Sequence, residues 1–363
     1  MRLTEFISAH GDWEELLSAP PYCIKIKRDG GYIIFSYSQI ESDFGIELVR
    51  ECRGVILEDI TFRPVCVPFY KFGNYGESYV PQIDWASART QEKIDGSLIK
   101  VWFDKGEWRV STSGNIFAAN SVLERTDLFP DGCPYNTYGD LFEAAKTAAG
   151  LDFDRLNRQY TYMFELVSPY NKVVIMYDKA EIYHIGTRDN VTLQEIEIDI
   201  GVKKPREFAL GSLDDCVTAA QNLPDDKEGY VVVDRYYNRV KIKNPVYVAL
   251  HHIKNNGAPS LVSLIGIIRK NEAGEYLTYF PEFKSKIDEC KRKIDGILAE
   301  MESGKESLRG KTFETQRDFA LEVKGKRFNN FYFEWRKDNA LTPSKWLWRQ
   351  PDEKIRTMLL SID

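Results

Sequence analysis

A lysine, an acid, a glycine and a hydroxyl residue lie close together in the stretch Glu92-Lys93-Ile94-Asp95-Gly96-Ser97. Two apolar runs typical of strands, 85–90 and 98–103, flank this stretch. A lysine at such a turn can attack phosphorus once its amine has lost its proton. Because Asp-Gly is also a common hairpin signal, the stretch taken alone is more typical of an exposed surface turn.

Further stretches carry groups that phosphorus chemistry needs. Glu51-Cys52-Arg53-Gly54 has an arginine beside a glycine, and Phe164-Glu165 has a carboxylate inside an apolar strand. Lys227-Glu228-Gly229 has a carboxylate at a strand entrance. Lys241-Ile242-Lys243 has two lysines on one strand face. Each alone also fits a plain structural role, such as a turn acid or a solvated strand face. A carboxylate within an apolar strand, however, is unfavourable unless it is paired.

Together these groups make chemical sense. The ordinary pKa of lysine is about 10.4, so nearby cations or burial must lower it before the amine can attack. Lys241 and Lys243, with a metal ion, could supply that field and neutralise a departing phosphate. Mg²⁺ needs one or two carboxylates besides phosphate and water, which Glu228 could provide. The sequence has no Walker-type phosphate loop.

Composition limits the class of protein. A chain of 363 residues predicts one large domain or two. Six scattered cysteines without paired spacing argue against a zinc site or a disulfide framework and for a reducing compartment. No apolar run of about 18 residues predicts a membrane span, and the first residues lack the apolar region of a signal peptide. We therefore expect no membrane partner and a cytoplasmic protein, in the host cytoplasm if a virus encodes it.

Charge is distributed unevenly along the chain. Residues 251–363 contain 21 Lys and Arg against 17 Asp and Glu, a net of +4, whereas residues 1–250 contain 28 against 38, a net of −10. The total of −6 excludes a broad basic footprint for nucleic acid. It still allows local contacts with phosphate groups.

The apolar patterns predict an α+β domain over residues 1–252 and an all-α domain over 253–363. Hairpins are predicted at 22–38 and 98–112, and a strand pair at 229–242. Other predicted strands are 49–57, 64–69, 85–90, 161–167, 172–177 and 180–187. Helices are predicted at 3–18, 116–125, 138–158, 212–222, 247–254, 260–269, 283–302, 313–323, 328–337 and 345–361.

The ordered series Lys93-Ile94-Asp95-Gly96, Phe164-Glu165, Glu228-Gly229 and Lys241-Ile242-Lys243 resembles the motifs of covalent nucleotidyltransferases, which include RNA ligases, DNA ligases and capping enzymes. Phe35-Ser36-Tyr37, Glu51–Val55, Lys71–Asn74 and Lys241–Val248 resemble more narrowly the bacteriophage-type RNA ligase 1 family. The resemblance covers about residues 20–275. It implies a nucleotidyltransferase domain of antiparallel, ATP-grasp-like sheets before the helical domain. The resemblance does not extend over the helical domain, for which a role in RNA specificity is one hypothesis.

The resemblance implies an ATP-dependent RNA ligase that uses Mg²⁺ or Mn²⁺. Lys93 would form a lysyl-AMP intermediate, AMP would pass to an RNA 5′-phosphate, and an RNA 3′-OH would then displace it. The substrate would be single-stranded RNA or a nicked loop, in RNA or tRNA repair, and we expect a monomer. The implied catalytic residues are Lys93, Asp95 and Tyr247; the ATP contacts are Tyr37, Arg53, Lys71, Glu92, Gly96, Glu165, Lys241 and Lys243; the metal ligands are Glu228 and Glu272.

One position departs from the family pattern, and two other classes remain open. Phage-type relatives carry a basic residue just before a glycine after the nucleophile hairpin, where this chain has Ser113-Gly114. A DNA ligase or capping enzyme would carry a β-rich OB domain after the lysine pair, which the helical pattern of 260–361 does not favour. A non-catalytic RNA-binding protein is favoured by Ser113 and disfavoured by the intact charged motifs.

Overall fold

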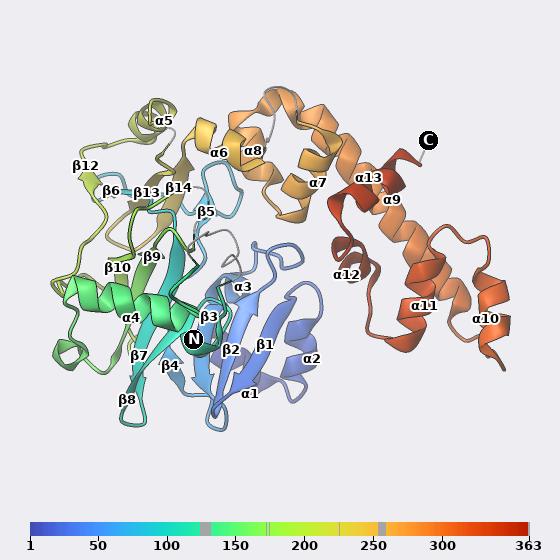
Figure 1. The fold of residues 1–363 in the computed structure, drawn as a ribbon, viewed down its shortest axis with the longest axis horizontal. Coiled ribbons are helices and arrows are strands. Elements are labelled where there is room, and N and C mark those ends of the chain that lie inside the picture. Colours follow the sequence, from blue (N-terminus) through green and yellow to red (C-terminus); the bar gives the residue numbers. More distant parts are fainter. Residues whose placement is uncertain (124–131, 172, 174, 225, 253–258, 362–363) are drawn as a thin grey trace. The chain divides into compact units, whose positions relative to one another are not determined.

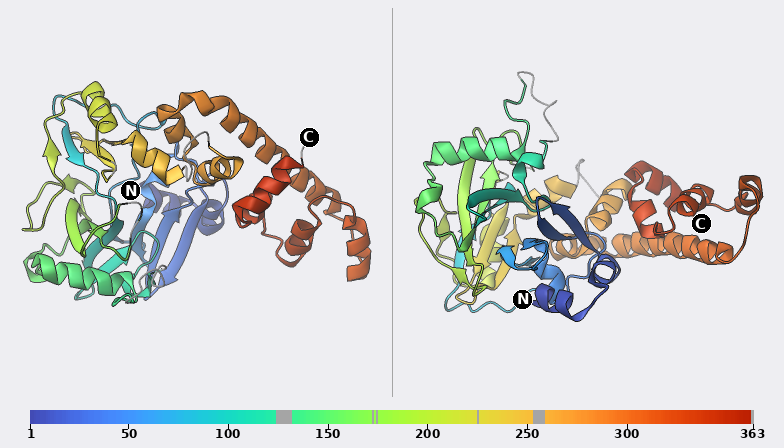
Figure 2. Two further views of the ribbon diagram at one scale, coloured as in Figure 1. Left: turned by 45° about the horizontal axis from the view of Figure 1, so that its top comes forward. Right: turned by 90° about the horizontal axis from the view of Figure 1, so that it is seen from below.

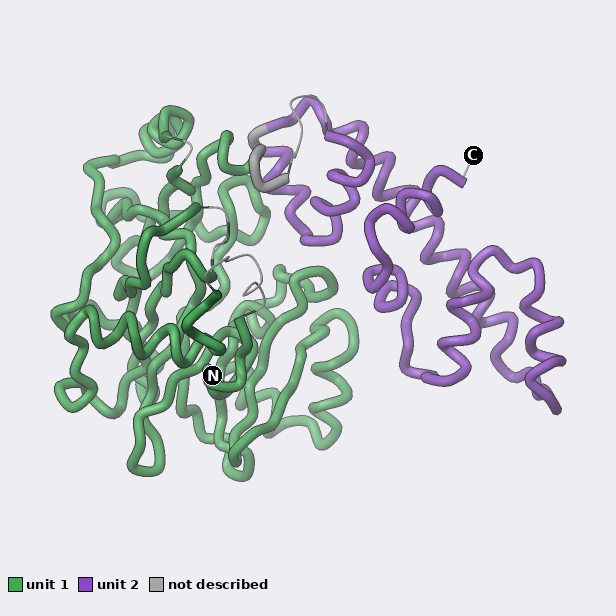
Figure 3. Tube along the Cα trace, in the orientation of Figure 1, with its two compact units in different colours: residues 1–251 green, residues 252–363 purple. Residues whose placement is uncertain are grey.

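The computed structural model describes residues 1–363 except 124–131, 172, 174, 225, 253–258 and 362–363. The chain divides into two compact units, Met1–His251 and His252–Asp363 (Figure 3). The first unit contains three mainly antiparallel sheets, and the second contains helices in its described residues. The α+β class with a helical C-terminal region is therefore confirmed, whereas the roles assigned to the two predicted domains stay predictions.

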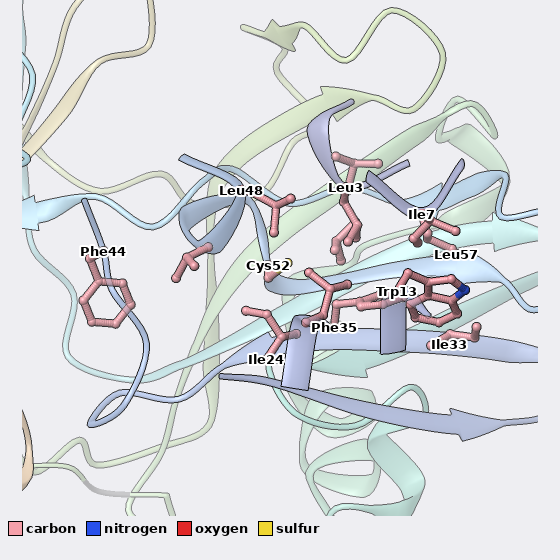
Figure 4. Close-up of a cluster of buried hydrophobic side chains, with 14 residues drawn as sticks. Leu3, Ile7, Trp13, Ile24, Ile33, Phe35, Phe44, Leu48, Cys52 and Leu57 are labelled. Atoms are coloured by element: carbon pink, nitrogen blue, oxygen red, sulfur yellow. The ribbon is translucent and has the colours of Figure 1, made fainter. Parts of the chain in front are cut away.

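The first sheet has the order β1-β2-β3-β4 and contains the predicted N-terminal hairpin. Its strands are β1 (Ile24–Asp29), β2 (Tyr32–Tyr37), β3 (Arg53–Glu58) and β4 (Pro64–Cys66). The helices α1 (Arg2–Ala9), α2 (Trp13–Ser18) and α3 (Glu47–Glu51) bury apolar side chains against one face. Figure 4 shows this cluster, in which Trp13 lies against Phe35 and Leu3 is fully buried. Because side chains alternate along a strand, the other face of β1 carries its lysines.

The second sheet has the order β12-β6-β13-β14-β5. It contains β5 (Gly73–Asn74), β6 (Arg89–Glu92), β12 (Glu207–Phe208), β13 (Gly229–Val233) and β14 (Arg239–Lys243). The helix α5 (Leu213–Gln221) buries Cys216 and Ala220 in the same apolar cluster as Tyr230, Val232 and Ile242 of the sheet. The helix α6 (Pro245–His252) follows β14 directly (Figure 1).

The third sheet has the order β11-β10-β9-β7-β8. Its strands are β7 (Ser97–Asp104), β8 (Glu107–Thr112), β9 (Tyr160–Val167), β10 (Glu181–Asp189) and β11 (Glu195–Ile196). The helix α4 (Tyr138–Ala149) covers one face through Leu141, Phe142 and Ala145 (Figure 2). A short 3₁₀ turn, Ala118–Asn120, precedes α4 in the chain, and another, Phe153–Arg155, follows it. Residues 94–96 cross directly from the second sheet to this one.

The second unit is built around the long helix α9 (Lys284–Leu308), which contacts α7, α12 and α13. Its other helices are α7 (Leu261–Arg269), α8 (Ala273–Tyr279), α10 (Gln316–Val323), α11 (Asn329–Lys337), α12 (Pro343–Trp348) and α13 (Asp352–Leu360), with a 3₁₀ turn at Pro281–Phe283. Within the described parts of the chain, none of the helices is both long and apolar enough to span a membrane.

Several predicted elements were wrong in type or position. The strand predicted over 49–57 begins as the helix α3, because Leu48 and Val49 are buried in the apolar cluster under α1. The strand predicted over 85–90 is shifted to β6, since the Asp84 carboxylate holds residues 84–87 in a turn. These short apolar runs fit helix and strand equally well in sequence.

Other errors concern helix ends. Among the described residues of 116–125, only Ala118–Asn120 are helical, in a 3₁₀ turn, and 124–125 lie outside the description. The helix predicted over 138–158 ends at Ala149, because Gly150 adopts a left-handed φ of 67°. Pro351 divides the predicted helix 345–361 into α12 and α13, and α8 was not predicted. The described residues of 172–177 form no strand; Lys172 and Val174 lie outside the description.

Candidate active site

Lys93 lies where the chain passes from the second sheet to the third. Its backbone N–H donates to the Gly229 carbonyl at 2.9 Å, which extends the pairing of β6 with β13 by one residue. Asp95 and Gly96 then lead into β7. The backbone of Lys93 is therefore fixed by strand pairing on its N-terminal side and continues into the short crossing segment on its C-terminal side.

The Lys93 ammonium lies against a buried carboxylate. Its Nζ is 2.6 Å from Oε2 of Glu228, whose side chain is 4% exposed. Lys243 Nζ is 3.9 Å from the other oxygen, Oε1, because Gly229 of β13 pairs with Lys243 of β14. Three charged groups that are 135 and 150 residues apart in sequence thus meet at one strand entrance.

Asn244 fixes this entrance and was not assigned a role from sequence. Its buried side chain donates to the carbonyls of Leu223, Pro224 and Lys227, and its backbone N–H donates to the carbonyl of Glu228. The only sequence signal was its place directly after the lysine pair. We assign Asn244 a positioning role, because it holds the turn that carries Glu228.

Glu165 reaches the site from β9, which pairs with β7 through Leu98. Its Oε1 accepts a hydrogen bond from the Gly96 N–H at 3.1 Å. Burial raises the pKa of Glu165 to about 7, although the positive charges of Lys93 and Arg53 oppose the rise. A Cβ at position 96 would lie 2.4 Å from the Leu166 carbonyl oxygen, so this close approach requires glycine.

Asp95 anchors the segment after Lys93 through hydrogen bonds, and its predicted catalytic role stays a prediction. It is 5% exposed, and its Oδ1 accepts a hydrogen bond from the Tyr247 hydroxyl at 3.0 Å. Its Oδ2 accepts from the Ile175 N–H, and its own N–H donates to the Tyr177 hydroxyl. Asp95 therefore ties the segment after Lys93 to α6 and to residues 175–177, and Tyr177 is a contact that sequence reasoning missed.

We expect Tyr247→Phe to destabilise the protein by about 1–3 kcal/mol, because it removes a donor from a buried carboxylate. Urea unfolding of wild type and variant measures this change. The matched control is Tyr236→Phe, whose side chain is 66% exposed and which should stay within about 0.5 kcal/mol of wild type. Equal stabilities of the two variants would contradict the anchoring role of Tyr247.

Four other predicted ATP contacts, Tyr37, Arg53, Lys71 and Lys241, lie in two cation–aromatic groups. The Arg53 guanidinium lies over the rings of Phe69 and Phe72, at 4.7 and 5.2 Å from their centroids, and Lys241 Nζ is 5.5 Å from the Phe72 ring. Lys71 is buried, with its Nζ over the rings of Tyr37 and Phe44. Such contacts orient the cations at a modest energetic gain. Phe72 was quoted only as part of a motif, yet it lies between Arg53 and Lys241.

Two further predicted site residues have other surroundings. Glu92 pairs with Lys227 at 2.9 Å, and its charge contributes to the raised pKa of Tyr183, which burial mainly causes. Glu272 is in the second unit, at the N-terminus of α8. Its predicted role as a metal ligand stays a prediction.

Gly54 makes a tight contact behind Arg53. It has a φ of +78°, and a Cβ there would lie 2.6 Å from the Ser113 carbonyl oxygen and 2.8 Å from Lys100 Nζ. Lys100 is fully buried and donates to the Gly54 carbonyl. Desolvation lowers the pKa of Lys100 to about 8, with a smaller contribution from the nearby Arg53 charge.

We expect Gly54→Ala to destabilise the protein by more than the roughly 1–2 kcal/mol that a left-handed residue costs, because the added methyl group would meet backbone. Gly106→Ala is a matched control, since Gly106 has a φ of +84° with no described atom within 4 Å of a built Cβ. Thermal or urea unfolding of both variants separates the two effects. Equal losses would show that the space behind Gly54 does not matter.

The side chains present fit an ATP-type substrate and one divalent cation. Among the described residues, no group of three or more His, Cys, Asp or Glu forms a preformed metal cage. Mg²⁺ usually keeps several waters and binds one or two carboxylates plus substrate phosphates. The buried Glu228 carboxylate, with Lys93 and Lys243 beside it, is suited to that mode.

Comparison with known proteins identifies the family. A family model described as RNA ligase matches residues 51–247, which is more than half of the chain. A bifunctional polynucleotide kinase/RNA ligase of Autographa californica nuclear polyhedrosis virus is 30% identical over 281 residues, covering 73% of this chain. The chain spans only 40% of that relative's length. An RNA ligase of Rhodothermus phage RM378 is 27% identical over 318 residues, covering 70% of this chain and 71% of the phage protein.

Solved structures show a looser likeness. An archaeal ATP-dependent RNA ligase covers 89% of each chain with a TM-score of 0.45 and 13% identity. A Naegleria gruberi RNA ligase with ATP and Mn covers 46% of this chain and 51% of its own, with a TM-score of 0.35 and 14% identity. The sequence match over residues 51–247 includes Arg53, Lys71, Lys93, Glu165, Glu228, Lys241 and Lys243 but not Tyr37. The chain belongs to the RNA ligase family, of the bacteriophage-type RNA ligase 1 kind.

Proposed function

We propose that this protein is an ATP-dependent RNA ligase that joins RNA 5′-phosphate and 3′-OH ends through a covalent lysyl-AMP intermediate. The observation that carries the proposal is the contact of Lys93 with Glu228, beside Lys243 and within electrostatic range of Glu165. An amine that is fixed among cations and carboxylates at the junction of two sheets is suited to attack a phosphate brought to it.

The reaction has three balanced steps. The Lys93 amine forms a P–N bond with the α-phosphorus of ATP, the bond to pyrophosphate breaks, and the amine loses a proton. The oxygen of an RNA 5′-phosphate then attacks the same phosphorus, which breaks the P–N bond and returns the lysine. Finally an RNA 3′-OH loses its proton to solvent and attacks the activated 5′-phosphorus, a phosphodiester forms, and AMP leaves with the bonding electron pair.

The side chains around Lys93 suit distinct roles in these steps. Lys241, Lys243 and a divalent cation held by Glu228 would favour the neutral form of the Lys93 amine, because nearby positive charges disfavour an ammonium. Lys241 and Lys243 would balance charge on the α-phosphate, and Arg53 and Lys71 charge on the other phosphates. Tyr37 would contact the nucleotide, Glu92 would lie against adenine, and Glu165 with the Gly96 N–H would hold the ribose.

A divalent cation, Mg²⁺ or Mn²⁺, would supply charge neutralisation of the phosphates, with Glu228 as the carboxylate that holds it. Glu272 remains a second proposed ligand. Asp95 and Tyr247 support catalysis through the fixed position of residues 94–96, and neither needs to contact ATP. Their proposed role is therefore positioning.

The proposed partner is RNA with 5′-phosphate and 3′-OH ends, either single-stranded or in a nicked loop, as in RNA or tRNA repair. We propose a monomer that works in the cytoplasm, or the host cytoplasm for a viral enzyme, with the helical unit contributing to the choice of RNA. The alternative chemistry of a DNA ligase or capping enzyme is less favoured, because the second unit is helical in its described residues.

The test is incubation of the protein with α-³²P-labelled ATP or GTP and Mg²⁺, after removal of any bound AMP with pyrophosphate. Denaturing electrophoresis should show label on the protein from ATP alone. A chase with 5′-phosphorylated RNA should move the label to RNA and then release it as AMP during joining. Label from GTP would indicate capping chemistry, a chase to DNA alone would indicate a DNA ligase, and no label would leave the non-catalytic RNA-binding protein.

A further inference from the structure

A groove of about 300 Å³ lies beside Gly54, on the face of the first sheet that its N-terminal helices leave open. Lys25 and Lys27 of β1 and Arg53 of β3 line it, together with Ser36 and Ser113. None of the described residues that line this groove is acidic. A groove with three cations and no carboxylate attracts anions.

The strand register explains why these cations share one face. Across the sheet, Lys25 pairs with Ser36 and Ser36 pairs with Arg53, so the three side chains form one row. Lys27 lies two residues further along β1, about 6.6 Å away, on the same face. Ile24, the residue before Lys25, points to the opposite face of the sheet and is buried there against the N-terminal helices.

The cations of the groove remain available for a ligand. Lys25, Lys27 and Arg53 form no ion pair with any carboxylate of the described chain. Lys27 Nζ contacts only neutral acceptors at 3.0 Å, the Gly114 carbonyl and the Asn115 side-chain oxygen. Lys25 and Lys27 are exposed, and β1 is the outer strand of its sheet. A long ligand can therefore leave the groove across β1 into solvent.

Lys27 places a positive charge near Ser113, the position at which phage-type relatives carry a basic residue. The Ser36 hydroxyl donates to the Ser113 carbonyl at 2.8 Å, which holds residues 113–114 against β2. The Lys27 ammonium reaches the carbonyl of the next residue, Gly114. A positive charge is thus present beside Ser113, supplied by β1 rather than by position 113 itself.

We infer that this groove binds phosphate groups of the RNA strand, with Lys25 and Lys27 as its backbone contacts. The inference rests on the proposed function. Arg53 and Tyr37 line the groove and are proposed ATP contacts, so the groove adjoins the proposed ATP site. ATP has only three phosphates, for which Arg53, Lys71, Lys241 and Lys243 are proposed, whereas an RNA strand carries further phosphates that can reach Lys25 and Lys27.

The test is the salt dependence of binding to a fluorescent, 5′-phosphorylated, single-stranded oligoribonucleotide, measured by anisotropy without ATP or metal. Each phosphate contact on a single strand contributes about 0.7 to the slope of log K against log salt. Lys25→Ala/Lys27→Ala should therefore lower the slope by about 1.4 and weaken binding about 25-fold at 0.1 M salt. Lys25→Arg/Lys27→Arg should keep the wild-type slope.

A charge-matched control is Lys179→Ala/Lys203→Ala, which removes two exposed lysines paired with Glu181 in the same unit and should keep the slope. Adding Ser113→Lys to the double alanine variant should restore about 0.7 of the slope. A wild-type slope in the double alanine variant would overturn the inference. A double alanine variant that keeps the wild-type slope but no longer forms the adduct from ATP would assign the groove to the triphosphate, which also overturns the inference.

Failure of the proposed function gives a different result. In that case the wild-type protein itself forms no adduct with labelled ATP, whatever its affinity for the oligoribonucleotide. If the wild type forms the adduct and the double alanine variant binds RNA as the wild type does, the proposed function stands and the role of this groove does not.

Discussion

Lys93→Ala is expected to abolish the covalent adduct with AMP, with a loss on the order of 10⁶-fold, the scale seen when a covalent nucleophile is removed. The reason is geometric. Lys93 is held beside Glu228 by the backbone contact with Gly229 and by the anchored Asp95. Phosphorimaging of denatured protein after incubation with α-³²P-ATP measures the adduct.

A matched control is Lys203→Ala. Lys203 Nζ also lies 2.6 Å from a glutamate oxygen, in Glu181 of the same unit, but outside the candidate site. This variant should label like wild type. RNA that is adenylated in advance should still be joined by the Lys93→Ala variant, because the last step needs no amine nucleophile. Labelled Lys93→Ala protein would refute the assignment of the nucleophile.

Glu165→Gln is expected to stabilise the protein at neutral and basic pH while it weakens catalysis. Burial raises the folded-state pKa of Glu165 from 4.5 to about 7. Between these values the folded state keeps a proton that the unfolded state releases, so wild-type stability falls as pH rises through this window. Glutamine carries no charge and removes this loss.

The stability difference should be absent below pH 4.5, grow between pH 4.5 and 7, and stay constant above pH 7. Its size should be roughly 1–3 kcal/mol, after allowance for solvent screening at a carboxylate that is only partly buried. Urea unfolding across pH measures it. Adduct formation should fall roughly 10- to 100-fold, the scale of a lost charged hydrogen bond to the ribose.

Glu58→Gln provides the control of opposite sign. Hydrogen bonds from the Thr61 backbone and side chain lower the pKa of Glu58 to about 2, so its replacement should destabilise the protein above pH 4.5. A Glu165→Gln variant that behaves in the same way, or one with unchanged pH dependence, would contradict the raised pKa of Glu165.

The sequence by itself determined the chemical inventory and most of the local structure. The turn at Gly30-Gly31, the hairpin 98–112 and the lysine pair on β14 follow from residue types and their alternation, which act over a few residues. It also indicated the change to helices near residue 252. These features need no knowledge of distant contacts.

The tertiary structure alone decided how the parts meet. Only the fold brings Lys93 to Glu228, makes Asp95 an anchor for Tyr247, and places Lys27 beside Ser113. The fold also makes residues 47–51 helical, because the burial of Leu48 and Val49 favours a helix where the apolar run alone fits helix and strand equally well. Burial and pairing across sheets depend on segments more than a hundred residues apart, and local pattern carries no information about that register.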